Sequence, residues 1–259
     1  MSSMNSCFKV YKISDLPKKY LDIYRKRLTN EHMLITELYD YNSYQVELFF
    51  ENCKDLLTCF NKILVNIKYP LNYYGRDADD VYYRYGTYLP TIFDTIYLVN
   101  LYNLKDFWKK CSETCRDGYG DCEDTSALTH CLFLKNQVDS FHCFGLVYKV
   151  VDDEKKLLGG HSFVIARIDT SYRLIETTLD EPVDSFSIFP VYDFTKPYIK
   201  FGDYIYYIVF MIHNKSELWI NTEYFRNNTE LLYEDIAELH EKEILRFGKF
   251  KRKRFKDLI

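Results

Sequence analysis

Cys122 stands in a segment whose residue types favour nucleophilic chemistry. Gly118 and Gly120 precede it and allow a tight turn that another chain can approach closely. Asp121 is a suitable N-cap, and Asp124 occupies the capping-box position, so the sequence predicts that Cys122 lies in the first turn of a helix. The free N–H groups of such a turn favour a thiolate, and the Cys122 backbone N–H can form half of an oxyanion hole.

The acidic neighbours of Cys122 act in the opposite direction. Asp121, Glu123 and Asp124 are like charges that raise the pKa of a nearby thiol. A thiolate at this position would therefore need an imidazolium partner. The alternative interpretation of the segment is a buried cysteine with a purely structural place at the helix start.

A histidine and a glutamate farther along the chain could complete a catalytic set. His161 follows Gly159 and Gly160 at the start of a predicted strand, where it would lie at the rim of a sheet. A loop of either two or four residues after Ile168 would put His161 and Glu176 on the same face of a hairpin. Hydrogen bonding to an imidazole would account for a carboxylate in that apolar strand, because an unpaired buried carboxylate is costly. A structural histidine and a glutamate that faces water are the alternatives.

These three residues together match the nucleophile, base and orienter of cysteine catalysis. We expect the Cys122 sulfur to lie about 3 to 4.5 Å from a ring nitrogen of His161. Glu176 is the expected acid, and Asp180 is the next candidate for that role.

The predicted elements favour an α+β fold, with helices first and an antiparallel sheet after them. Apolar residues at three-and-four spacing predict helices before residue 140, and alternation predicts strands after it. We expect three regions in one compact domain, namely N-terminal helices over 1–84, a core over 85–214, and a helix with a basic tail over 215–259. The expected helices span 18–28, 43–67, 89–102, 122–133 and 229–247, and the expected strands span 144–151, 161–168, 173–178 and 204–212.

Three short segments resemble the transglutaminase-like cysteine peptidase superfamily, in particular its microbial branch. They are GDCED at 120–124, GGHSF at 159–163 and LIETT at 174–178, and the resemblance covers about residues 85 to 212. It implies a papain-like core, in which a helix that carries the cysteine packs on an antiparallel sheet that carries the histidine and the acid.

The resemblance also implies acyl transfer at an amide or isopeptide bond of a protein or peptide substrate, without a cofactor. Hydrolysis by a cysteine peptidase or amidase is favoured over crosslinking. The family's nucleophile, histidine and acid would fall on Cys122, His161 and Glu176, although the family more often has aspartate at the third position. The Cys122 N–H would supply one oxyanion donor, and Tyr119 or Trp108 the second. The main alternative is a catalytically silent member of the superfamily that serves as a protein-interaction scaffold.

A metal site is not expected, although cysteines gather in one segment. Cys111 and Cys115 form one closely spaced pair, and Cys122, His130 and Cys131 follow. A structural zinc site normally has two such pairs. We therefore expect Cys111 and Cys115 to be buried thiols, or a disulfide if the source is a hyperthermophile.

Composition and charge exclude several classes of protein. The net charge of −4 does not demand nucleic acid as a partner, and the basic tail at 249–256 is the one hint of it. The longest apolar run, Ile205 to Ile212, is too short for a membrane span of about 20 residues. With no signal-peptide pattern, we expect an intracellular protein. Abundant residues with AT-rich codons, such as the 25 Tyr and 19 Phe, favour a microbial or viral source.

Overall fold

The computed structural model describes residues 8–15, 22–26, 30–69, 108–151, 154–196 and 198–221. They form helices and antiparallel strands, so the α+β class predicted from the sequence is confirmed. The chain divides into two compact units. Unit 1 holds the described residues of 1–21, 143–161 and 190–259, and unit 2 holds those of 22–142 and 162–189. The predicted helices over 89–102 and 229–247, the basic tail and the predicted boundary at 84–85 lie outside the described residues.

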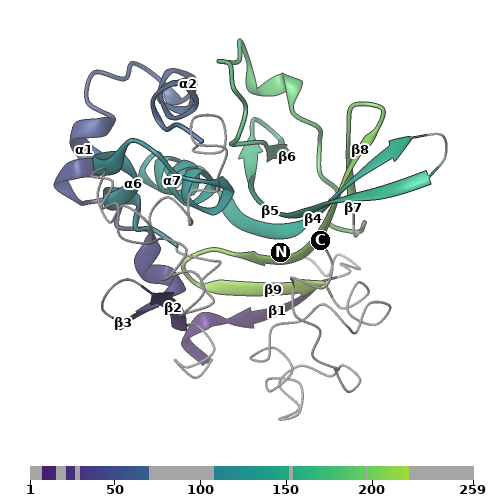
Figure 1. Ribbon diagram of the computed structural model, residues 1–259, viewed down its shortest axis with the longest axis horizontal. Coiled ribbons are helices and arrows are strands. Elements are labelled where there is room, and N and C mark those ends of the chain that lie inside the picture. The colour runs from purple at the N-terminus through teal and green to yellow at the C-terminus, as the bar shows by residue number, and fades with distance from the viewer. Residues whose placement is uncertain are drawn as a thin grey trace, which may run out of the picture. The chain divides into compact units, whose positions relative to one another are not determined.

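Unit 1 is built on antiparallel strands in the order β1-β9-β8-β4-β5, with β7 pairing on β8. Figure 1 shows β1 and β9 side by side, with Phe8 paired to Asn221. The rings of Phe8, Phe194 and Trp219 pack against one another, with centroids 5.3 to 6.3 Å apart. The strands are β1 (Phe8–Lys12), β4 (Ser140–Val151), β5 (Glu154–Ile168), β7 (Tyr198–Phe201), β8 (Ile205–His213) and β9 (Glu217–Asn221).

Strands β4 and β5 also run into unit 2, because β4 begins there and β5 ends there. In unit 2, β5 pairs with β6 (Ser171–Ile175), and Ile168 lies opposite Ser171. The loop between them therefore has two residues, which selects one of the two loop lengths that the sequence allows. Its first residue, Asp169, has a φ of 54°, a left-handed conformation that aspartate adopts more readily than most residues. Continued by one pair, this register sets Glu176 opposite Phe163.

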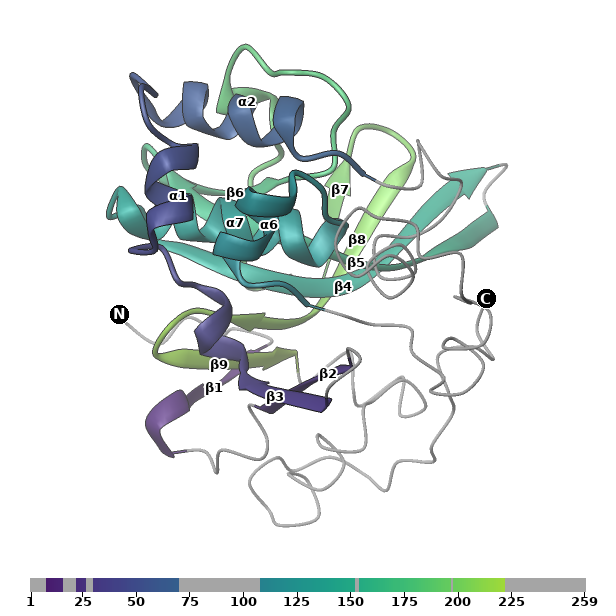
Figure 2. The ribbon, with the colours of Figure 1, turned by 60° about the vertical axis from the view of Figure 1, so that its left-hand side comes forward.

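Helix α7 (Cys122–Lys135) confirms the helix predicted over 122–133 and contributes much of the core of unit 2. It packs against α2 (Leu56–Asn66) on one side and α6 (Cys111–Asp117) on another (Figure 2). Leu128 and Phe133 of α7 and Phe60 of α2 have no exposed surface. No helix in the described part of the chain has the length and apolar character that a membrane crossing needs.

The single helix predicted over 43–67 is wrong, because the chain forms two helices there. The first is α1 (Tyr44–Phe49), and α2 begins only at Leu56. Between them Asn52 has a φ of 64°, which a helix cannot contain. Asp55 then caps α2, since its carboxylate accepts a 2.7 Å hydrogen bond from the Thr58 backbone N–H. The cap breaks an apolar spacing that is otherwise continuous.

The helix predicted over 18–28 is also wrong where the structure describes it. Residues Asp22–Lys26 form β2, which pairs antiparallel with β3 (Asn30–Leu34). A short helix without tertiary packing is marginal, whereas an adjacent strand satisfies the backbone directly. After β3 the chain continues through a 3₁₀ helix, Ile35–Leu38, toward α1.

Candidate active site

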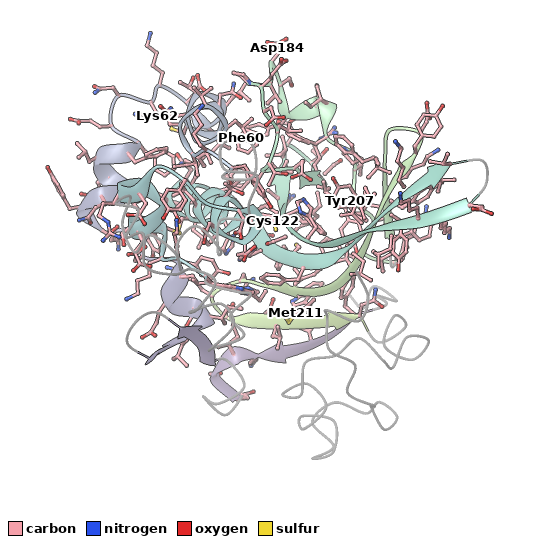
Figure 3. All side chains as sticks on the ribbon, viewed as in Figure 1. Phe60, Lys62, Cys122, Asp184, Tyr207 and Met211 are labelled. Atoms are coloured by element: carbon pink, nitrogen blue, oxygen red, sulfur yellow. The ribbon has the colours of Figure 1, made fainter. Side chains whose placement is uncertain are left out.

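Cys122 is the first residue of α7, as the sequence predicts (Figure 3). Its N-cap, Asp121, makes no side-chain cap bond, but the Asp121 backbone N–H bonds to the Asp124 carboxylate. Only that half of the expected capping box forms. A Cβ on Gly120 would lie 2.6 Å from the Cβ of Asp124, so only glycine fits there. The turn before Cys122 is therefore packed directly on the first turn of its helix.

Lys68, two residues after the end of α2, fixes the other side of this turn. The Lys68 backbone N–H donates to the Gly118 carbonyl at 3.0 Å, and the Gly120 N–H donates to the Lys68 carbonyl at 3.2 Å. Gly118 ends α6 with a φ of 71°, in the left-handed conformation that favours glycine. The backbone conformation thus favours glycine at position 118, and close packing requires it at position 120.

The surroundings of Cys122 favour its thiol form over the thiolate. Burial raises the pKa of Cys122 well above its usual value, and the charges of Glu123 and Asp121 raise it further. The sulfur donates a 3.2 Å hydrogen bond to a Glu123 carboxylate oxygen. The backbone N–H of Ser162 acts in the opposite direction by bonding to the sulfur. Burial and acidic neighbours thus prevail over the helix start, so a thiolate requires a proton acceptor close by.

The Ser162 side chain begins a chain of buried hydrogen bonds. Its Oγ is 2.6 Å from Nε2 of His142, and Nδ1 of that histidine is 2.8 Å from the Tyr39 hydroxyl. His142 has no exposed surface, and its ring packs 6.2 Å from that of Trp108. The sequence indicates His142 only as a histidine within an apolar strand, and no local pattern indicates Tyr39.

Glu176 follows the last residue of β6 and is buried, with 5% of its surface exposed. One of its carboxylate oxygens accepts three hydrogen bonds, from the backbone N–H groups of Thr177 and Thr178 and from the Thr178 hydroxyl. These bonds are 2.7 to 3.0 Å long and fix the orientation of the carboxylate. Glu176 is therefore an ordered buried acid, not a glutamate that faces water.

Threonine and serine hydroxyls attach the Glu176 segment to the helix of Cys122. The Thr177 hydroxyl lies 3.1 Å from that of Thr125 and 2.9 Å from that of Ser126. Thr125 in turn donates to the Asp121 carbonyl at 2.8 Å. Hydrogen bonds thus connect the segment that contains Glu176 to the first turn of α7 within unit 2.

His161 belongs to unit 1, as its last residue before the chain enters unit 2 at Ser162. Its side chain is half-buried, and its ring packs 5.9 Å from that of Tyr207. The structure therefore brings Cys122 and the Glu176 segment together in unit 2 and has His161 in unit 1. The peptide whose N–H bonds the Cys122 sulfur is the one that joins His161 to Ser162.

A buried lysine supports the turn that contains the cysteine. The Lys109 ammonium donates to the Tyr119 carbonyl at 2.8 Å and lies 3.5 Å from the centre of the Tyr119 ring. It also lies 3.7 Å from Asp117 and 3.9 Å from Asp124. Burial raises the pKa of Asp124 to about 6, although Lys109 opposes this. No pattern in the sequence indicates a role for Lys109. The roles of Tyr119 and Trp108 as oxyanion donors stay predictions.

The remaining cysteines of this region are thiols. The sulfurs of Cys111 and Cys131 lie 2.7 Å apart and are fully buried, and Cys115 is half-buried nearby. Burial raises the pKa of both Cys111 and Cys115. Among the residues that the structure describes, no group of three or more histidine, cysteine or acidic side chains has an arrangement that could hold a metal ion.

The arrangement combines a thiol, a backbone N–H directed at its sulfur, and a fixed carboxylate in the adjoining segment. This chemistry suits a nucleophile that is charged only when a base takes its proton. Comparison with known proteins assigns no family, because no family model, curated protein or solved structure matches the chain.

Proposed function

We propose that this chain is a thiol-dependent acyl-transfer enzyme that acts on an amide or isopeptide bond of a protein or peptide. Cys122 is the nucleophile, His161 the base and Glu176 the group that orients the imidazole. Hydrolysis, as in a cysteine peptidase or amidase, is favoured over crosslinking. The reaction takes place inside a microbial cell or a virus-infected host cell.

One observation carries the proposal. The Cys122 sulfur accepts a hydrogen bond from the backbone N–H that immediately follows His161. A residue's Cα lies within about 2.5 Å of the next residue's N, so the chain itself brings the His161 backbone close to the sulfur. The Glu176 segment adjoins the same helical turn through Thr177. In addition, Glu176 follows the strand paired with the one that carries His161.

The chemistry proceeds through a thioester. His161 takes the thiol proton, and the Cys122 sulfur attacks the carbonyl carbon of the substrate amide. The Cys122 N–H stabilises the oxyanion that forms. His161 then gives the proton to the leaving nitrogen as the C–N bond breaks. Water, deprotonated by His161, attacks the thioester, and the thiol is restored as the acid product leaves.

A papain-like core of the transglutaminase-like superfamily fits this chemistry. Helix α7 supplies the cysteine at its start, and the hairpin of β5 and β6 leads into the acid. The resemblance of the motifs at 120–124, 159–163 and 174–178 supports the same assignment.

A fluorogenic peptide-amide library and intact mass spectrometry test the proposal on the full chain. The wild type should release the amine and form an acyl adduct on Cys122. Cys122→Ala should lose both, whereas Cys53→Ala, a half-buried cysteine on another segment, should keep both. Turnover that survives in Cys122→Ala, or an adduct on another cysteine, would overturn the proposal.

The raised pKa of Cys122 and its bond to Glu123 favour a second candidate, a silent interaction scaffold. A scaffold would bind its peptide or protein partner without any acyl adduct. The same library separates the two functions, because a scaffold gives binding to wild type and Cys122→Ala alike and no amine release from either.

A further inference from the structure

A pocket of about 310 Å³ lies beside the first turn of α7, and every residue that lines it belongs to unit 2. Three segments form its walls, namely the end of α2 with the residues just after it, the first turn of α7, and the segment that follows Glu176. Its volume lies at the lower end of the range for ligand sites, which suits a single side chain better than a whole cofactor.

The pocket adjoins both the proposed nucleophile and the proposed acid. Thr125, on its wall, follows Cys122 by three residues, so the two side chains lie on the same side of α7, about 4.5 Å apart along the helix axis. Thr178, which also lines the pocket, donates its hydroxyl proton to the Glu176 carboxylate at 2.7 Å. An acyl chain attached to the Cys122 sulfur therefore has the pocket within reach of its first residues.

Three apolar side chains stand among the polar residues that line the pocket. Leu64 and Ile67, at the end of α2, are 6% and 5% exposed, and Leu179 is half-buried. Three threonines line the pocket, and their hydroxyls already have hydrogen-bond partners. Thr125 donates to the Asp121 carbonyl, Thr178 donates to Glu176, and the Thr177 hydroxyl lies 2.9 Å from that of Ser126. The charged residues Lys68 and Asp180 are exposed and of opposite sign, so a charged occupant gains nothing from the net charge.

We propose that this pocket receives an apolar side chain of leucine or phenylalanine size from a peptide substrate. That side chain belongs to one of the last two residues on the acyl side of the bond that is cleaved. This inference rests on the proposed function and adds the substrate class to it. Burial of such a side chain against Leu64, Ile67 and Leu179 supplies the specificity.

Binding to the Cys122→Ala chain tests the pocket without turnover. The probes are acetylated peptide amides that carry Leu, Phe, Ala, Lys or Glu at each of the last two positions in turn. At one of these positions, Leu or Phe should bind about tenfold more tightly than Ala, Lys or Glu. Equal affinities for Leu and Ala would overturn the proposal, and so would a preference for Lys or for Glu.

A substitution that fills the pocket sharpens this test. Lys68 lines the pocket, so Lys68→Trp adds an indole to its wall, and the backbone bonds of Lys68 to the glycine turn do not need its side chain. The preference for Leu should fall below about threefold. Asp180→Trp adds an indole from another lining residue and replaces Lys68→Trp if that variant misfolds. The matched control is Lys62→Trp, because Lys62 lies on another side of α2 from the buried Phe60 and does not line the pocket (Figure 3).

The two proposals fail in different ways. Amide cleavage by the wild type without any preference for Leu or Phe, or a preference that both filling variants leave intact, overturns the pocket alone. A clear preference in Cys122→Ala, together with no cleavage and no acyl adduct in the wild type, overturns the catalytic function and leaves the pocket as the binding site of a scaffold.

Discussion

Single residues around Cys122 set the state of its thiol. Burial, Glu123 and Asp121 raise its pKa, and the Ser162 N–H alone among the causes acts to lower it. The acidic pair in the motif thus favours the thiol form of Cys122 over the thiolate. A protonated thiol resists oxidation and stray alkylation, so reactivity depends on the moment when a base takes the proton.

Replacing Glu123 with glutamine should make Cys122 more reactive toward iodoacetamide at pH 7. The change removes a negative charge and a charged hydrogen-bond acceptor from the thiol, so the pKa of Cys122 falls and the thiolate fraction rises. A fall of one pKa unit corresponds to an increase of about tenfold in that fraction. The labelling rate at Cys122, followed by peptide mass spectrometry from pH 6 to 10, checks this against Glu181→Gln, an exposed control. A slower or unchanged rate would contradict the role of Glu123.

Asp124 should make the protein less stable as the pH rises from about 4 to about 6. Burial raises the pKa of Asp124 to about 6 in the folded chain, above the value of about 3.9 in the unfolded chain. The folded state therefore binds more protons in that window, and the free energy of unfolding falls until Asp124 is ionised. Urea unfolding at pH 4, 5, 6 and 7 checks this.

Asp124→Asn supplies the comparison, because it keeps an oxygen to accept the 2.9 Å bond from the Lys109 backbone N–H. The pH dependence between 4 and 6 should be weaker in this variant. If the free energies of unfolding of the wild type and of Asp124→Asn change equally between pH 4 and 6, Asp124 does not titrate as expected.

Among the elements, those with local signals were predictable from the sequence, and those fixed by distant partners were not. Helix α7 follows from the glycines and capping residues at its start, and the hairpin of β5 and β6 follows from alternation and turn residues in its own segment. The break before α2 depends on the Asp55 cap, and β2 depends on its pairing with β3. The bond between Tyr39 and His142 joins residues that are 103 positions apart, so no local pattern could indicate it.

Gly120→Ala should destabilise the chain by about 1 to 3 kcal/mol, the usual cost of an overpacked contact. The added methyl would lie 2.6 Å from the Asp124 Cβ, and the turn is held on its other side by Lys68, so neither neighbour can yield easily. Chemical denaturation measures the loss. Gly202→Asn is the control, since its turn has a φ of 63° and open space around it, and it should change stability by less than about 0.5 kcal/mol. An equal effect of the two variants would refute the packing explanation.

On the scale of the whole molecule, the proposed triad needs residues from both units. Cys122 and Glu176 come from unit 2, and His161 comes from unit 1. The boundary falls inside β5, between His161 and Ser162. The proposed base and the N–H that bonds the sulfur therefore belong to the same strand.

The roles within the triad should appear as non-additive losses of kcat/KM. Cys122→Ala and His161→Ala should each reduce it by at least about a thousandfold, and the double variant should be no worse than either alone, because the two residues act as one unit. Glu176→Gln should be milder, since it keeps an acceptor for the imidazole. Steady-state kinetics with the best library peptide measure all four. Additive losses would mean that Cys122 and His161 do not cooperate, and an unaltered rate in Glu176→Gln would remove Glu176 from the site.

The passage of β4 and β5 from one unit into the other has a consequence for how the protein is made. The chain crosses between units at 21–22, at 142–143 and 161–162 inside these strands, and at 189–190, so neither unit corresponds to a continuous stretch of the gene. A fragment that ends at any of these points carries an incomplete unit. Synthesis must therefore pass residue 190 before unit 1 can close.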